Sequence, residues 1–179
     1  TGAAIVVTDA IVPVSSTSNF VCNAGDVNVT VNPGPVLAIG LDITVCSETS
    51  NGNVLDGEPG SIVSATYNIT AINTNGLVAS AGAPVTGNGF GTNEISDDAY
   101  TNATNAPVIV TYTIVPVSAD NCEGDAFDVN VTISPEPILS TTLDATVCSD
   151  NASGVVLDVE PGSIAAATFN ITAINTNGL

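Results

Sequence analysis

The chain contains no lysine, arginine or histidine, against 18 aspartate and glutamate residues in a length of 179. Without a cationic side chain, no side-chain salt bridge forms, and no basic patch exists to bind nucleic-acid phosphates or anionic lipid. A Ser-His-Asp or Cys-His arrangement, a Schiff-base lysine and a phosphate-binding P-loop are excluded for the same reason. The composition therefore argues against a nucleic-acid partner, membrane insertion and most enzyme chemistry.

Carboxylates are the only side chains left for acid-base chemistry, and they come in close pairs at residues 56–58, 97–98 and 123–125. Each pair lies beside glycine, serine or asparagine in a stretch typical of turns, where solvent keeps a carboxylate ionised. We therefore expect no catalytic residue and no enzyme. Calcium is the one candidate cofactor, as a counter-charge, but no metal or cofactor residue is assigned. The simpler interpretation is that a net charge of −18 keeps the surface soluble.

Tryptophan and methionine are absent, and aromatic residues make up only 4% of the chain. Carbohydrate sites usually present aromatic rings for stacking, so this scarcity argues against sugar recognition. Apolar residues make up 44% of the chain, which is ample for the cores of ordinary domains. Stability must come from apolar burial, backbone ladders and disulfides.

The sequence repeats itself at an offset of about 102 residues. Residues 34–77 and 136–179 are identical at 29 of 44 aligned positions. Two shorter matches, at offsets of 102 and 103, pair residues 26–30 with 128–132 and 11–15 with 114–118. A period of this length is too long for a solenoid and suits separate domains in tandem. We interpret the chain as a window from a longer array.

Two proline pairs, at 33/35 and 135/137, predict the domain boundaries. Proline cannot donate to a sheet ladder, so each pair ends a strand and stiffens the join that follows. An alternative makes the first pair a hairpin turn, because Cys22 and Cys46 lie equidistant from Gly34. The preferred division has three parts: the end of one repeat at 1–33, a complete repeat at 34–135, and the beginning of the next at 136–179.

Strand patterns predict the fold class. Residues 27–31 and 67–71 alternate apolar with polar side chains, the period of a strand with one buried face. Residues 107–115 are β-branched or aromatic on both faces, which is typical of a central strand. Turn residues separate these runs, and no helical periodicity of useful length occurs. The expectation is an all-β protein of tandem antiparallel β-sandwich domains of immunoglobulin-like architecture.

Four cysteines recur as two per repeat: Cys22, Cys46, Cys122 and Cys148. Without a CxxC spacing or a histidine they do not suit zinc, so we expect disulfides and an oxidising, extracellular compartment. The connectivity stays open. A hairpin at 33–35 joins Cys22 to Cys46 and Cys122 to Cys148. A linker there places Cys46 and Cys122 in one domain, where a bond between them staples its first strand to its last hairpin, or lets each bridge to an adjacent domain.

Six asparagines lie in Asn-x-Ser/Thr sequences, about as many as this composition gives by chance, and they are glycosylation candidates: Asn28, Asn68, Asn102, Asn130, Asn151 and Asn170. The repeat makes Asn28 equivalent to Asn130, and Asn68 equivalent to Asn170. Each of these four occupies the polar phase of an alternating strand, so we expect their side chains to face solvent. The simpler interpretation is that asparagine and threonine decorate exposed sheet faces.

Three motifs taken together resemble a known family: residues 44–47, which return at 146–149, residues 114–125 and residues 129–137. They are similar to the PKD-like, immunoglobulin-like tandem repeats of giant secreted surface adhesins of Bacteroidota, including those of gliding bacteria. The resemblance covers essentially the whole chain. It implies a cell-surface or extracellular stalk of many such domains, exported by a dedicated secretion system, with no enzymatic residue to carry over.

Three functions remain open after these arguments. The first is a structural repeat of an extracellular stalk or filament, with neighbouring repeats of the same protein as partners, disulfides and covalent glycans. The second is an adhesion module that binds carbohydrate or another surface. The third is a pilin-like subunit, in which residues 1–33 and 136–179 complete a neighbour's sandwich by strand addition.

Overall fold

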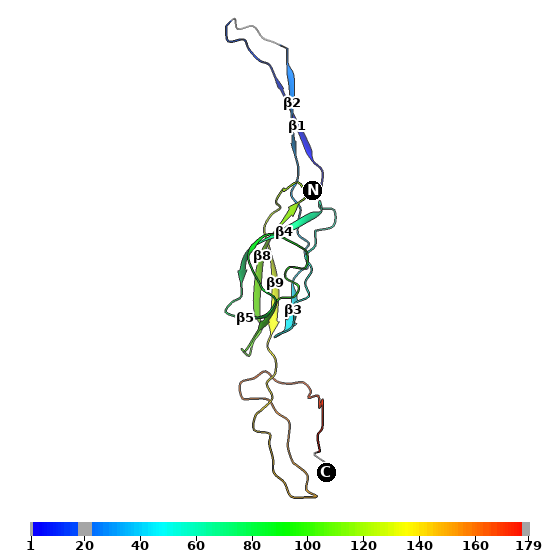
Figure 1. The fold of residues 1–179 in the computed structure, drawn as a ribbon, viewed down its shortest axis with the longest axis vertical. Coiled ribbons are helices and arrows are strands. Elements are labelled where there is room, and N and C mark those ends of the chain that lie inside the picture. Colours follow the sequence, from blue (N-terminus) through cyan, green and yellow to red (C-terminus); the bar gives the residue numbers. More distant parts are fainter. Residues whose placement is uncertain (1, 18–22, 177–179) are drawn as a thin grey trace.

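The computed structural model of the chain describes residues 2–17 and 23–176. Every regular element among these residues is a strand, which confirms the expected all-β class, and none of them forms a helix able to cross a bilayer. Figure 1 shows the strands along the chain: β1 (Ile5–Ile11), β2 (Gly25–Val31), β3 (Ile43–Cys46), β4 (Ser64–Asn73), β5 (Val78–Ala81), β6 (Gly87–Phe90), β7 (Ala99–Thr101), β8 (Val108–Ser118) and β9 (Phe127–Ser134).

The main sheet has five strands in the order β3-β9-β8-β4-β6, with β8 in the centre as its sequence predicts. Strand β8 pairs antiparallel with both β4 and β9. Strand β3 differs from the expected antiparallel pattern, because it runs parallel to β9, with Ile43 opposite Val131 and Cys46 opposite Ser134. Strands β3 and β9, the first and last strands of the domain, lie side by side and run in the same direction, so no hairpin joins them.

Alternation along β8 and β9 points one face of the sheet into the core. Val129, Val131 and Ile133 on β9 are at most 1% exposed, whereas the residues between them are less buried. A second layer covers this face with Leu37, Leu55, Ile95 and Tyr100, the last from the small β5-β7 sheet, and the two layers share one apolar cluster. The result is a β-sandwich whose core residues run from Leu37 to Ile133.

The remaining segments leave this sandwich at opposite ends (Figure 1). The β1-β2 hairpin projects from one end, and residues 136–176 project from the other. Strand β2 pairs with β1, and β3 pairs with β9, so residues 26–32 and 36–45 do not form the alternative hairpin. The boundaries at 34 and 135 stay a prediction of the repeat.

Residues 36–61 and 138–163 form the same loop structure. In the first, the Val36 amide donates to Ser61 Oγ (2.7 Å), and Leu37 bridges Gly57. In the second, the Ile138 amide donates to Ser163 Oγ (2.8 Å), and Leu139 bridges Val159. The repeated sequence therefore folds the same way locally, with or without a sandwich around it.

Candidate functional site

The most unusual polar group in the sandwich is a buried acid, Asp98, against two tyrosines, so the expectation that the acids at 97–98 are both solvated is wrong for Asp98. Tyr112 Oη donates to Asp98 Oδ2 at 2.7 Å, and the hydroxyl groups of Tyr100 and Tyr112 lie 2.6 Å apart. All three residues are at most 2% exposed. The second oxygen of Asp98 makes no hydrogen bond of normal geometry, and it lies where a side chain on Gly82 would stand.

Burial raises the pKa of Asp98 from 3.8 to about 6. The Tyr112 hydrogen bond opposes this rise, the negative charges of Asp97 and Glu94 add to it, and the nearby Ala83 amide also lowers the pKa. Burial likewise raises the pKa of the Tyr100 hydroxyl. The cluster faces the interior, so its geometry offers a structural tie between the layers.

Three of the other acids that the sequence brings close together accept hydrogen bonds from backbone or side-chain groups. Asp56 Oδ1 accepts from the Gly57 amide at 2.7 Å, and Glu58 Oε2 accepts from the Ile39 amide at 3.1 Å. Glu123 Oε1 accepts from Asn68 Nδ2 at 3.2 Å. No group of three or more acidic, cysteine or histidine side chains in the described part of the chain gathers as a metal site would require.

The glycosylation candidates fall into two groups in the structure. Asn28, Asn151 and Asn170 are exposed, and Asn130 is partly exposed. Asn28 Oδ1 accepts from Thr8 Oγ1 at 2.6 Å, and Asn130 Oδ1 accepts from Thr111 Oγ1 at 2.9 Å, so these equivalent residues make the same cross-strand bond. In this group Asn28, Asn151 and Asn170 have exposed side chains, whereas Asn130 Nδ2 donates to Asp42 Oδ2 at 3.4 Å.

Two candidates are buried, and for Asn68 the expected solvent-facing position is wrong. Asn68 is 9% exposed, and its Oδ1 accepts from the Gly89 amide at 3.0 Å. Strand β6 and the loop that carries Glu123 cover this side of β4, which a pattern within β4 does not reveal. Asn102 is 4% exposed, and its Nδ2 donates to the Ile133 carbonyl at 2.7 Å.

The described cysteines lie apart, and none is bonded to another. Cys46 is exposed beside Ser134, at the end of the sandwich where the chain leaves. Cys122 lies at the opposite end, in a loop whose Gly124 packs against the Pro35 carbonyl where the chain enters. Cys148 is exposed in the segment after the sandwich, and Cys22 is outside the described residues.

Residues 44–137 match the PKD-like domain, and this match covers more than half of the chain. The chain belongs to the PKD-like domain family. No curated protein and no solved structure matches it. A PKD-like domain is an immunoglobulin-like β-sandwich and typically a non-catalytic, extracellular module. The site just described agrees with such a module, because its polar groups bond to the backbone or to one another.

The sequence alone did not reveal the structural polar groups of this PKD-like domain. Asn51 Nδ2 donates to the Ile95 carbonyl and Asn53 Nδ2 to the Leu41 carbonyl, each at 2.5 Å. Both asparagines are 6% exposed, although they lie in a stretch typical of a solvated turn. Residues 50–53 hold no sequence signal for this burial, because a Ser-Asn-Gly-Asn stretch is typical of a solvated turn.

Proposed function

We propose that the chain is a structural segment of an extracellular stalk or filament, built from PKD-like sandwiches in tandem, as in the arrays of surface adhesins. The observation that carries this proposal is the direction of the chain through the sandwich. The chain enters at one end, leaves at the other, and then resumes the same sequence repeat (Figure 1). Such a path makes each repeat add length instead of bulk.

The entry to the sandwich is tightly packed, which supports a stiff array. A side-chain carbon on Gly34 would lie 2.2 Å from the Glu123 carbonyl oxygen, and one on Gly124 would lie 1.8 Å from the Pro35 carbonyl oxygen. Asn32 Nδ2 also reaches Asp120 Oδ2 at 3.4 Å. Only glycine permits two backbones to approach so closely, so the linker is held against the domain that follows it.

The charge and the aromatic residues favour structure over recognition. A net charge of −18 with no cation makes neighbouring molecules repel one another, which keeps an array soluble. The three tyrosines, Tyr67, Tyr100 and Tyr112, are at most 2% exposed, so they offer no ring for a sugar to stack on. Phe127 and Phe169 are each 38% exposed but lie in separate segments of the chain, so the aromatic residues give the adhesion-module alternative little support.

Small-angle X-ray scattering of the 179-residue chain tests the stalk, at concentrations where light scattering shows a monomer. We expect an elongated particle, and a broader distribution of lengths when Pro135 and Pro137 are both replaced by serine. Pro84→Ser, within the sandwich, is the matched control and should leave the distribution unchanged. A compact particle, or a double variant indistinguishable from the control, contradicts a stiff tandem array.

For the cysteines, we propose disulfides between neighbouring repeats. Cys46 lies at the exit of the sandwich, and Cys122 lies at the entry. The repeat therefore brings a Cys46-type and a Cys122-type residue together at each junction between consecutive domains. This arrangement is one of the three left open by the sequence, and it supports a covalently stapled fibre. Glycans at the accessible asparagines, Asn28, Asn130, Asn151 and Asn170, would add a coat to the same fibre.

A further inference from the structure

The β1-β2 hairpin displays, in the open, an apolar face that is buried elsewhere in the same molecule. At offsets of 103 and 102, the hairpin is the counterpart of β8-β9, and even the register is the same: Val7 opposes Val29 as Val110 opposes Val131. Val29 is 49% exposed, whereas Val131 is 0% exposed. The face consists of exposed apolar residues from both strands: Ile5, Val7, Ile11, Val27, Val29 and Val31.

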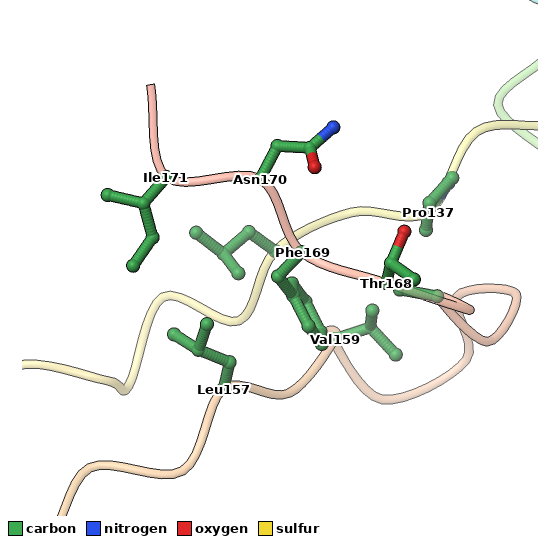
Figure 2. Close-up of a pocket in the computed structure, with 9 residues that line it drawn as sticks. Pro137, Leu157, Val159, Thr168, Phe169, Asn170 and Ile171 are labelled. Carbon is green, nitrogen blue, oxygen red and sulfur yellow. The ribbon is translucent and has the colours of Figure 1, made fainter. Parts of the chain in front are cut away.

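Residues 137–171 display the complementary set. Leu139, Leu157, Phe169 and Ile171 are between 38% and 73% exposed, whereas their counterparts 102 positions earlier are at most 2% exposed: Leu37, Leu55, Tyr67 and Ile69. They line a hollow of about 340 Å³. Figure 2 shows Leu157, Val159 and Phe169 lying together, with the Asn170 amide pointing away from them. The hollow is mainly apolar, and no segment among the described residues covers it.

The central sandwich shows how these two faces fit each other. The counterparts of both sets form its single core, in which β9 and β8 lie between β3 and β4. By the same pairing, residues 145–148 would run parallel to β2, and residues 166–175 would run antiparallel to β1. Both outer edges of the described hairpin are free for such pairing, since it is a sheet of two strands.

Within these 179 residues the hairpin and the hollow lie at opposite ends with the sandwich between them, so the hairpin of one copy does not reach its own hollow (Figure 1). We propose that the β1-β2 hairpin of a second copy of this chain docks into the 137–171 hollow, head to tail. The inference concerns the 179-residue chain and rests on the residue-by-residue equivalence to the sandwich core.

The hybrid sandwich formed in this way has four of the five strands of the main sheet. Neither segment supplies a counterpart of residues 78–102, which give Ile95 and Tyr100 to the core. Asp9 occupies the position that corresponds to Tyr112 of β8. The hybrid lacks residues 78–102, which contain the hydrogen-bond partners of Tyr112, so Asp9 faces solvent there. Because the hybrid lacks one strand and part of the core, we expect the two copies to associate reversibly. Because both copies are acidic, salt strengthens the complex by screening their repulsion.

Two single variants test the proposal with the 179-residue chain itself, through sedimentation velocity over a range of protein and salt concentrations. The unaltered chain should form oligomers that grow beyond a dimer with concentration, since a head-to-tail contact does not close. Val29→Asp removes the hairpin face, and Ile171→Asp removes the hollow. Each variant alone should be monomeric, because every copy then lacks the same half of the contact.

An equimolar mixture of the two variants should form a 1:1 heterodimer and nothing larger, because only one functional hairpin and one functional hollow remain. Both substitutions are at exposed positions, so the central sandwich folds in each. Val78→Asp, an exposed valine on β5, is the matched control and should assemble like the unaltered chain. A monomeric unaltered chain, self-association of either variant alone, or a mixture without the heterodimer would overturn the proposal.

Discussion

Replacing Asp98 with asparagine measures how much a buried carboxylate lowers the stability of the sandwich at neutral pH. Asp98 is 2% exposed, and burial raises its pKa from 3.8 to about 6. A difference of about 2 pKa units corresponds to about 3 kcal/mol in the free energy of unfolding. Because burial favours the protonated form of Asp98 in the folded state, the unaltered chain keeps this contribution of about 3 kcal/mol in full below pH 3.8. It loses this contribution as the pH rises through about 6.

Asparagine has the size of aspartate, and its carbonyl oxygen can still accept the Tyr112 hydrogen bond, but it carries no charge at any pH. We expect the stability of the variant relative to the unaltered chain to increase by about 3 kcal/mol between about pH 4 and pH 8. Urea unfolding, followed by far-UV circular dichroism and by the fluorescence of the buried tyrosines, measures this difference at each pH. Urea is uncharged and does not screen the acids.

Asp125→Asn is the control for the loss of one negative charge from so acidic a chain. Asp125 is exposed in the same domain, and its replacement should leave the dependence of stability on pH almost unchanged. If the unfolding curves of the unaltered chain and of Asp98→Asn run parallel across this pH range, the carboxylate is not held in the environment described here, and the reasoning fails.

Two further predictions concern the junctions. Gly124→Ala should destabilise the sandwich by about 3 kcal/mol, because the added carbon would lie 1.8 Å from the Pro35 carbonyl oxygen. In Gly91→Ala, the control, the added carbon meets no atom within 4 Å, so this variant should have little effect in the same urea denaturation assay. In native fibres, Cys46 and Cys122 should resist alkylation without reductant and appear as a peptide joined by a disulfide; thiols that label freely would exclude the staple between repeats.

The sequence alone was sufficient for features that depend on neighbours along the chain. The strand periods at 27–31 and 67–71 lie within β2 and β4, the run at 107–115 overlaps β8, and the absence of helical periodicity matches an all-β fold. The loops at 36–61 and 138–163 take the same structure because their hydrogen bonds join residues at most 25 positions apart. Composition alone likewise excluded any site that requires histidine, lysine or arginine.

Tertiary structure decided what depends on distant strands. Residues 43–46 and 64–73 become β3 and β4 because they exchange backbone hydrogen bonds with β9 and β8. The nearly identical residues 145–148 and 166–175 form no strand without such partners. Asn68 is buried by β6, although its own strand pattern predicts solvent. A strand is completed only by pairing, and burial only by a second layer, so neither is determined by the segment itself.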